Sequence, residues 1–179
     1  MLEVALLTER TIRFRLVEIS DAEFILGLRI NPTLNEHLSE TPPDIEHQRA
    51  WLAGYKAGEA DNKQYYFIIE RHDGVACGAV RLYDFLRESF CWGSWILNSD
   101  KTRYAAIESA LLVYRAGFDM LGYPSCHFDV RKQNHRVISF HLRTGAEIIR
   151  EDAENYYFIL PRDVFNRKKD QLARWVNER

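Results

Sequence analysis

Cysteine is scarce in this sequence of 179 residues: only Cys77, Cys91 and Cys126 occur, at scattered spacings and without a CxxC pair. This pattern indicates neither a disulfide framework nor a zinc site, so we expect no bound metal. Reduced thiols are typical of the cytoplasm, where we expect the protein to function. No apolar run approaches membrane-spanning length, and the N-terminus lacks the features of a signal peptide, so we expect no membrane partner.

An excess of positive charge is also lacking. The 24 Lys and Arg residues against 26 Asp and Glu residues give a net charge of −2, which does not favour a nucleic-acid partner. No GxGxxG or GxxxxGK[ST] follows a strand-like segment, which excludes the usual dinucleotide and ATP loops. The apolar fraction of 46% and aromatic fraction of 13% instead predict one globular domain over residues 1–179.

The periodicity of apolar residues predicts strands and helices along the whole chain. A strand over residues 11–18 precedes helices over 21–30 and 45–57, and Asp73-Gly74 predicts the turn of a β-hairpin. The later predicted elements are a strand 89–97, a long helix 104–121, a strand 125–131, a helix 135–144, strands 146–151 and 155–160, and an amphipathic C-terminal helix. The order β α α β β β α β α β β α predicts a mixed α+β fold around one sheet.

The segment "HFDVRKQNHRVISFHLRTGAEII", residues 127–149, carries a recognisable pattern. A strand is followed by an Asn, a short helix with an aromatic-type residue, and a Gly that closes the helix. Together with the long helix that follows a polar loop, this pattern resembles the GCN5-related N-acetyltransferase (GNAT) superfamily. The resemblance extends from Ile12 to about Leu160. It implies a twisted, mostly antiparallel sheet of about seven strands, flanked by helices, in which two central strands splay apart.

The resemblance also implies acetyl-CoA as co-substrate, with its pantetheine arm between strands 89–97 and 125–131. The amides of the arm would pair with the exposed edge of the first strand, as an extra strand would. His141 lies where many relatives carry a Tyr that protonates the leaving thiolate, and imidazole can do the same. The alternatives without a functional role are a surface position for His141 and a purely helix-capping role for Asn134. The implied arm-binding residues are Trp95, Ile96, Leu97 and Asn134.

The pyrophosphate of acetyl-CoA would bind where the polar loop meets the long helix. Relatives usually carry Gln/Arg-x-x-Gly-x-Gly/Ala there, because glycines let phosphates approach the backbone N–H groups. In the matching stretch "RYAAIE", Ala106 replaces the first glycine, and the carboxylate of Glu108 is expected to repel phosphates unless it points away. The predicted binding residues are Lys101, Arg103, Tyr104, Ala105 and Ala106.

A base and an acceptor site should lie near the splayed strand ends. Alternation places His127 and Asp129 on one face of their strand, as candidates for removing the amine proton. Their alternative is a structural His–Asp pair. Arg81, Tyr83 and Trp92 would suit an anionic, ring-bearing acceptor, although β propensity alone also favours such aromatics.

The sequence therefore predicts an N-acetyltransferase that acts on the primary amine of a small molecule. The stretches "WGSWIL" and "AIESALLVYRAGFDMLGY" resemble GNAT proteins of bacterial surface-polysaccharide pathways, and this resemblance implies a nucleotide-linked amino sugar as acceptor. Two alternatives keep the chemistry but take a protein N-terminus or a polyamine as acceptor, and a third is a non-catalytic ligand-binding module. The cysteines are expected to be core residues rather than nucleophiles, and a homodimer is possible.

Overall fold

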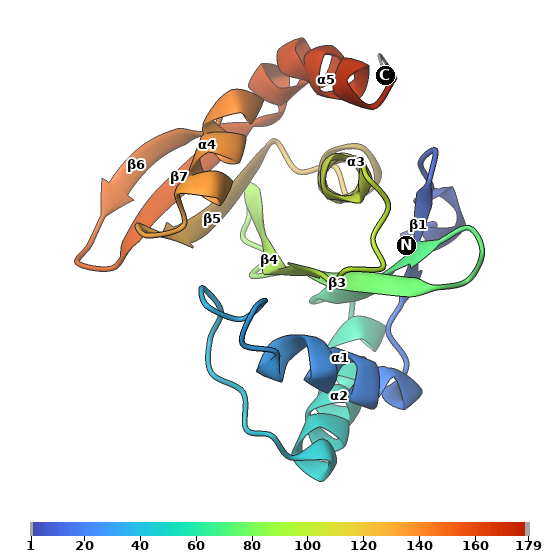
Figure 1. The fold of residues 1–179 in the computed structure, drawn as a ribbon. Coiled ribbons are helices and arrows are strands. Elements are labelled where there is room, and N and C mark those ends of the chain that lie inside the picture. Colours follow the sequence, from blue (N-terminus) through green and yellow to red (C-terminus); the bar gives the residue numbers. More distant parts are fainter. Residues whose placement is uncertain (1, 178–179) are drawn as a thin grey trace.

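The structure, a computed structural model, describes residues 2–177 and contains a seven-stranded sheet in the order β1-β2-β3-β4-β5-β7-β6 (Figure 1). Neighbouring strands are antiparallel except β4 and β5, which are parallel. The predicted mixed α+β fold with a mostly antiparallel sheet is therefore confirmed. The strands are β1 (Ile12–Leu16), β2 (Tyr65–Arg71), β3 (Ala76–Tyr83), β4 (Ser89–Leu97), β5 (Ser125–Arg131), β6 (Glu147–Glu151) and β7 (Asn155–Pro161).

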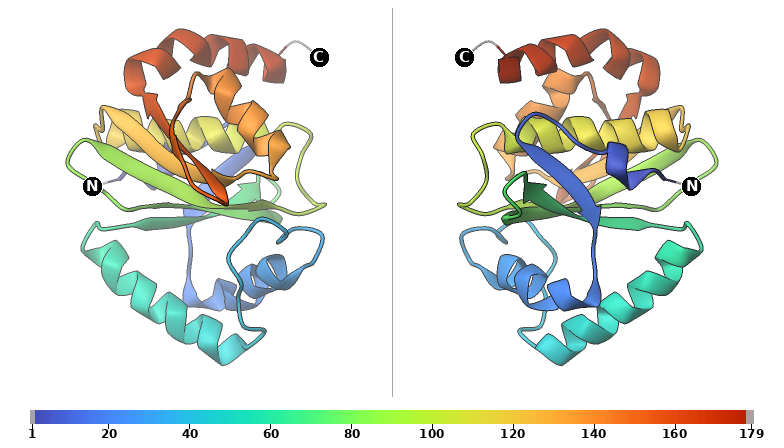
Figure 2. Two further views of the ribbon diagram at one scale, coloured as in Figure 1. Left: turned by 90° about the vertical axis from the view of Figure 1, so that its left-hand side faces the viewer. Right: turned by 90° about the vertical axis from the view of Figure 1, so that its right-hand side faces the viewer.

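Helices cover both faces of the sheet (Figure 2). One face carries α1 (Ala22–Ile30) and α2 (Ile45–Ala60). The other carries α3 (Ala105–Tyr114), α4 (His135–Thr144) and α5 (Arg162–Asn177). Within residues 2–177, none of the helices combines the length and the apolar character needed to cross a bilayer.

Several predicted boundaries differ from the structure: the helix predicted as 45–57 runs to Ala60, and the strand predicted as 146–151 begins at Glu147. Two further differences have local reasons. The first strand ends at Leu16 rather than at residue 18, because Ile19–Asp21 forms a 3-10 turn that is closed by a capping box between Glu18 and Asp21. The long helix, predicted as 104–121, is α-helical to Tyr114 and continues as a π-helix over Arg115–Met120. The order of strands and helices is otherwise as predicted.

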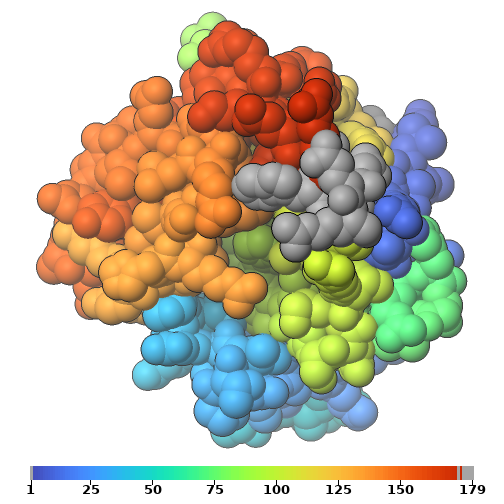
Figure 3. All heavy atoms as spheres, turned by 45° about the horizontal axis from the view of Figure 1, so that its top comes forward, coloured from blue at the N-terminus to red at the C-terminus, as the bar shows by residue number. Residues whose placement is uncertain are grey.

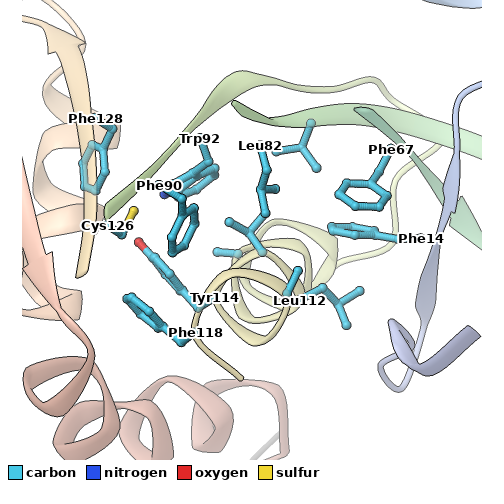
Figure 4. Packing of buried hydrophobic residues seen from close by; sticks show 14 of the residues in the cluster. Phe14, Phe67, Leu82, Phe90, Trp92, Leu112, Tyr114, Phe118, Cys126 and Phe128 are labelled. Carbon is cyan, nitrogen blue, oxygen red and sulfur yellow. The ribbon is translucent and has the colours of Figure 1, made fainter. Parts of the chain in front are cut away.

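Aromatic side chains dominate the core between the sheet and α3 (Figure 4). Phe90 packs edge-to-face on Phe118 at 5.4 Å, and Trp92 packs on Tyr114 at 5.6 Å. Burying one such large side chain stabilises a fold by about 1.5–3 kcal/mol. The π-helix brings Gly117 so close to Phe90 that an added Cβ would lie 2.0 Å from a ring carbon. This core fixes α3 beneath the centre of the sheet and so positions its N-terminus.

The centre of the sheet opens between β4 and β5. The two strands pair only over their first residues, from Ser89↔Ser125 to Cys91↔His127, whereas β5 pairs with β7 along its whole length to Arg131. A bulge in β4 contributes, because Ser94 and Trp95 together face one residue of β3. Ser94 has a φ of 49°, a left-handed conformation that costs a residue other than glycine free energy. The implied splay of two central strands is therefore present.

Candidate active site

A cavity of about 320 Å³ lies where β4 and β5 part; we call it the strand-gap cavity. Figure 3 shows that side of the molecule, where α4 (orange), the loop before α3 (yellow-green) and the segment between α1 and α2 (blue) come together. Its walls come from both faces of the sheet, from the α1–α2 segment and from α4. They are Arg29, His37, Leu38, Ser39, Tyr83, Trp92, Gly93, Ser94, Trp95, Phe128, Asp129, Val130, Arg131, Asn134, Val137, His141 and Asn155.

One face of α4 points into this cavity. Asn134, Val137 and His141 are spaced i, i+3 and i+7, which places them on one side of a helix. Asn134 caps the helix, since its Oδ1 accepts a hydrogen bond from the Val137 N–H at 3.3 Å. Gly145 ends it with a φ of 96°, a conformation that favours glycine. The capping role of Asn134 is thus confirmed, while its contact with a donor substrate stays a prediction.

His141 is buried among aromatic rings. Its exposed fraction is 3%, and its ring lies 4.1 Å from that of Phe128 and 5.4 Å from that of Trp92. The alternative of a surface position is therefore wrong. Burial lowers the pKa of His141 to about 3, so the imidazole is neutral near pH 7. Its Nδ1 is buried and has no hydrogen-bond partner among residues 2–177, and His141 lines the cavity.

The unpaired edge of β4 forms another wall. Beyond Cys91 the strand has no β5 partner, so the segment from Trp92 to Leu97 borders the gap. Trp95 is held by a hydrogen bond from its Nε1 to Ser109 Oγ at 3.0 Å and by packing on Phe140. The predicted arm-binding residues Trp95, Ile96 and Leu97 therefore lie on a free strand edge, although Ile96 directs its side chain into the α1–α2 core.

The loop before α3 offers positive charge and a helix N-terminus. Lys101 and Arg103 are exposed, and the Arg103 guanidinium lies 5.5 Å from the centre of the Tyr104 ring. Ala105 and Ala106 form the first turn of α3. Backbone N–H groups and a helix dipole in such a turn suit phosphates, so the residues present fit a pyrophosphate.

Glu108 also belongs to the first turn of α3, but its side chain is directed toward Thr11. Its side chain is buried and accepts a hydrogen bond from Thr11, whose hydroxyl also lies 2.6 Å from that of Thr102 in the loop. The second oxygen, Oε1, is buried without a hydrogen-bond partner among residues 2–177, and burial raises the pKa of Glu108. The carboxylate is held by Thr11, the residue before β1, and whether it repels phosphates stays a prediction.

His127 and Asp129 share a face of β5, as predicted, but they do not pair. The His127 ring nitrogens contact Ser89 Oγ at 2.8 Å and Asp84 Oδ2 at 3.0 Å. The alternative of a His127–Asp129 pair is therefore wrong, and the partner carboxylate is Asp84. Asp129 is exposed and lines the strand-gap cavity, whereas His127 is not among the residues that line it. The structure thus separates the two candidate bases.

The three predicted acceptor residues divide between two cavities. Tyr83 and Trp92 line the strand-gap cavity. Burial raises the pKa of Tyr83, and the nearby Asp129 carboxylate adds to that rise. Arg81 lines a neighbouring cavity of about 240 Å³, which we call the arginine cavity. Its walls are Arg29, Ser39, Glu40, Thr41, Pro42, His47, Gln48, Trp51, Tyr66, Arg81 and Ser94.

Sequence reasoning missed Arg29, Trp51 and Ser94. For Ser94 a signal existed, because Gly-Ser within "FCWGSWIL" is typical of a bulge in a strand. Arg29 and Trp51 lie on predicted helices, and nothing in their spacing indicates that they meet at one cavity. The cysteines behave as predicted: all three are buried and unpaired, and burial raises the pKa of Cys126 well above its usual value. No group of three or more His, Cys, Asp or Glu within residues 2–177 is arranged to hold a metal ion.

Comparisons with known proteins fit this site. A family model described as Acetyltransferase (GNAT) domain matches residues 11–147. The apo structure of FdhC, described as a nucleotide-linked sugar GNAT, is 53% identical with a TM-score of 0.84, and the match covers 92% of this chain and 94% of FdhC. No curated protein sequence matches.

More distant structures share the fold alone. A GCN5-related N-acetyltransferase from Brucella melitensis is 18% identical with a TM-score of 0.75, over 94% of this chain and 84% of its own. Spermidine N-acetyltransferase from Vibrio cholerae, in complex with CoA and spermine, is 16% identical with a TM-score of 0.74, over 87% and 98%. Since the family model spans more than half of the sequence, the chain belongs to the GNAT acetyltransferase family.

Proposed function

We propose that this acetyltransferase uses acetyl-CoA to acetylate a primary amine on a nucleotide-linked sugar. The observation that carries the proposal is the strand-gap cavity, whose walls come from both faces of the sheet. A donor from the α4 face and an acceptor from the α1–α2 face would meet between β4 and β5. The 53% identity to FdhC, a nucleotide-linked sugar GNAT, supports this acceptor class.

Acetyl-CoA supplies an acetyl thioester. On this chain, the free edge from Trp95 to Leu97 offers backbone groups for the pantetheine amides and an N–H donor for the oxyanion. Lys101 and Arg103, with the first turn of α3, would hold the pyrophosphate. The Asn134 side chain amide lies beside the same cavity. Substitution of Lys101, Arg103 and Asn134 can test whether their side chains contribute to binding acetyl-CoA.

The reaction needs a neutral amine. As its nitrogen bonds to the acetyl carbon and the carbon–sulfur bond breaks, one proton must leave the nitrogen and one must reach the sulfur. Asp129 is the stronger candidate for accepting the amine proton, because it is exposed within the cavity. His127, which is held by Ser89 and Asp84 outside the cavity, is better suited to fixing the β4–β5 start than to touching substrate.

His141 is proposed to serve the departing sulfur. Because burial lowers the pKa of His141 to about 3, the imidazole is neutral at pH 7 in the protein without substrate. The neutral ring can still donate an N–H hydrogen bond. A thiolate formed beside it would also raise its pKa, since an adjacent negative charge favours the imidazolium.

The other acceptors fit the charges less well. A polyamine is a polycation, and the acceptor side of the cavity carries Arg29 and the nearby Arg81. A ligand-binding module without catalysis would need neither an ionisable group in the gap nor a free strand edge.

A homodimer stays a prediction, which light scattering after size-exclusion chromatography would check.

Calorimetric titration with acetyl-CoA is the first test, with CoA and a nucleotide lacking pantetheine as controls. We expect specific binding of both CoA compounds. Release of free thiol should then be measured with UDP- and dTDP-linked amino sugars, spermidine and a peptide N-terminus as acceptors. Faster release with an amino-sugar nucleotide supports the proposal. Faster release with spermidine or the peptide, or no binding of acetyl-CoA at millimolar concentration, overturns it.

A further inference from the structure

The arginine cavity lies on the α1–α2 face of the sheet, next to the strand-gap cavity. Three residues, Arg29, Ser39 and Ser94, line both cavities, so the two spaces share a border. Ser94 belongs to the β4 bulge and Ser39 to the segment between α1 and α2. A ligand bound in the arginine cavity can therefore extend past this border toward the gap.

Two guanidinium groups face this cavity without a carboxylate partner. Arg29 donates to Thr41 Oγ1 at 2.6 Å and to Ser39, and Arg81 donates to Gln64 Oε1 at 2.8 Å. Across residues 2–177, no carboxylate lies within 4.0 Å of either group. The exposed Glu40 is the only acidic residue in the cavity wall.

The guanidinium group of Arg81 is also partly buried. Its Nε is buried without a hydrogen-bond partner among residues 2–177, and desolvation, with Arg29 contributing, lowers the pKa of its guanidinium. A charge removed from water without a counter-charge is costly. An anion bound between Arg29 and Arg81 would offset that cost, and two guanidinium groups match two negative charges.

Aromatic rings complete the wall. The Arg81 guanidinium lies 4.9 Å from the ring centre of Trp51 and 5.7 Å from that of Tyr66. Trp51 is 39% exposed although it stacks on Tyr55 with an interplanar angle of 5°. The exposed part of this indole, next to an anion site, offers apolar surface for contact with a planar base.

We propose that the arginine cavity binds the nucleoside diphosphate part of the acceptor, with the diphosphate on Arg29 and Arg81 and the base against Trp51. This inference rests on the proposed function and assigns the part of the acceptor that does not react. The shared border at Ser94 then puts the sugar, and its amine, into the strand-gap cavity beside Asp129. The site is separate from the loop of Lys101 and Arg103, which is proposed for the phosphates of CoA.

UDP and dTDP are the probes, titrated calorimetrically into protein that is saturated with CoA, so that the CoA site is closed to them. We expect one nucleoside diphosphate to bind more tightly than pyrophosphate, and pyrophosphate more tightly than the free nucleoside. Arg29→Gln and Trp51→Ala should each raise the dissociation constant at least about 10-fold. Arg87→Gln, an exposed arginine in the β3–β4 turn, is the matched control and should leave it unchanged. Arg81→Gln is a further variant, used if circular dichroism shows that it folds.

Three outcomes overturn the inference: no binding of either diphosphate at millimolar concentration, displacement of the diphosphate by CoA, or equal loss of binding in Arg87→Gln. Failure of the proposed function looks different, because diphosphate would bind as described while no amino-sugar nucleotide is acetylated. Conversely, acetylation of a sugar nucleotide by a protein that does not bind free diphosphate through Arg29 and Trp51 removes the cavity assignment and leaves the proposed function intact.

Discussion

The two faces of the sheet differ sharply at the gap between β4 and β5. On the α4 face, Trp92, Phe128 and Phe158 surround His141 and hold it neutral. On the α1–α2 face, Asp129 is exposed and Arg29 and Arg81 lack carboxylate partners within 4.0 Å among residues 2–177. One face therefore suits an uncharged thioester and the other a charged acceptor. The gap joins two environments of different polarity, and substitutions on either side should separate their roles.

The largest effect is expected from Asp129→Asn, which removes the negative charge of the candidate base on the α1–α2 face. Loss of a general base typically lowers kcat by about 10²–10⁴-fold, whereas the dissociation constant of acetyl-CoA should stay unchanged. Steady-state kinetics and calorimetry measure the two quantities. His127→Asn is the matched control on the same strand face and should change kcat by only a few-fold. A larger loss in His127→Asn than in Asp129→Asn would reverse the assignment of the base.

The second effect is expected from His141→Phe on the opposite face. The substitution keeps an aromatic ring in the aromatic pocket but removes the N–H donor, so kcat should fall by about 10–100-fold while the fold and acetyl-CoA binding persist. The measurement is kcat from pH 6 to 9, together with circular dichroism. An unchanged turnover rate across this range would show that another group protonates the sulfur.

His141 also shows what could be predicted from the sequence. Its place on a short helix between Asn134 and Gly145 follows from capping signals that a reader of the sequence can see. Its burial does not, because "SFHLRTG" allows either Phe140 or His141 to face inward, and the aromatic partners come from distant strands. The pairing of His127 with Asp84 could not be predicted from the sequence either, since it requires a contact between the β3–β4 turn and β5. The order of elements was predictable, whereas contacts between elements decided which residues form the site.

A third effect concerns stability rather than rate. The pKa of His141 is lowered in the folded protein to about 3 from about 6.5, so the unfolded chain binds more protons between these values. Its contribution to stability is thus fully present above pH 6.5 and is lost as the pH falls toward 3, by up to about 1.4 kcal/mol per pH unit. The free energy of unfolding, measured with urea between pH 4.5 and 7.5, should rise less steeply with pH for His141→Phe than for the parent. The same pH dependence of the unfolding free energy in both proteins would mean that His141 becomes protonated in the folded state as easily as in the unfolded chain.

The smallest effect is expected from Glu108→Gln, in the first turn of α3. The buried carboxylate has one oxygen without a partner and a raised pKa, so its charge opposes folding above the unfolded pKa near 4.5, and this cost grows as the pH rises. An amide removes the charge and can still accept the Thr11 hydrogen bond. We expect stabilisation of about 1 kcal/mol at pH 8, seen as a Tm rise of roughly 2–4 °C, and less at pH 5. A fall in Tm at pH 8 would instead show that the ionised carboxylate is needed to hold Thr11 and the Thr102 loop together.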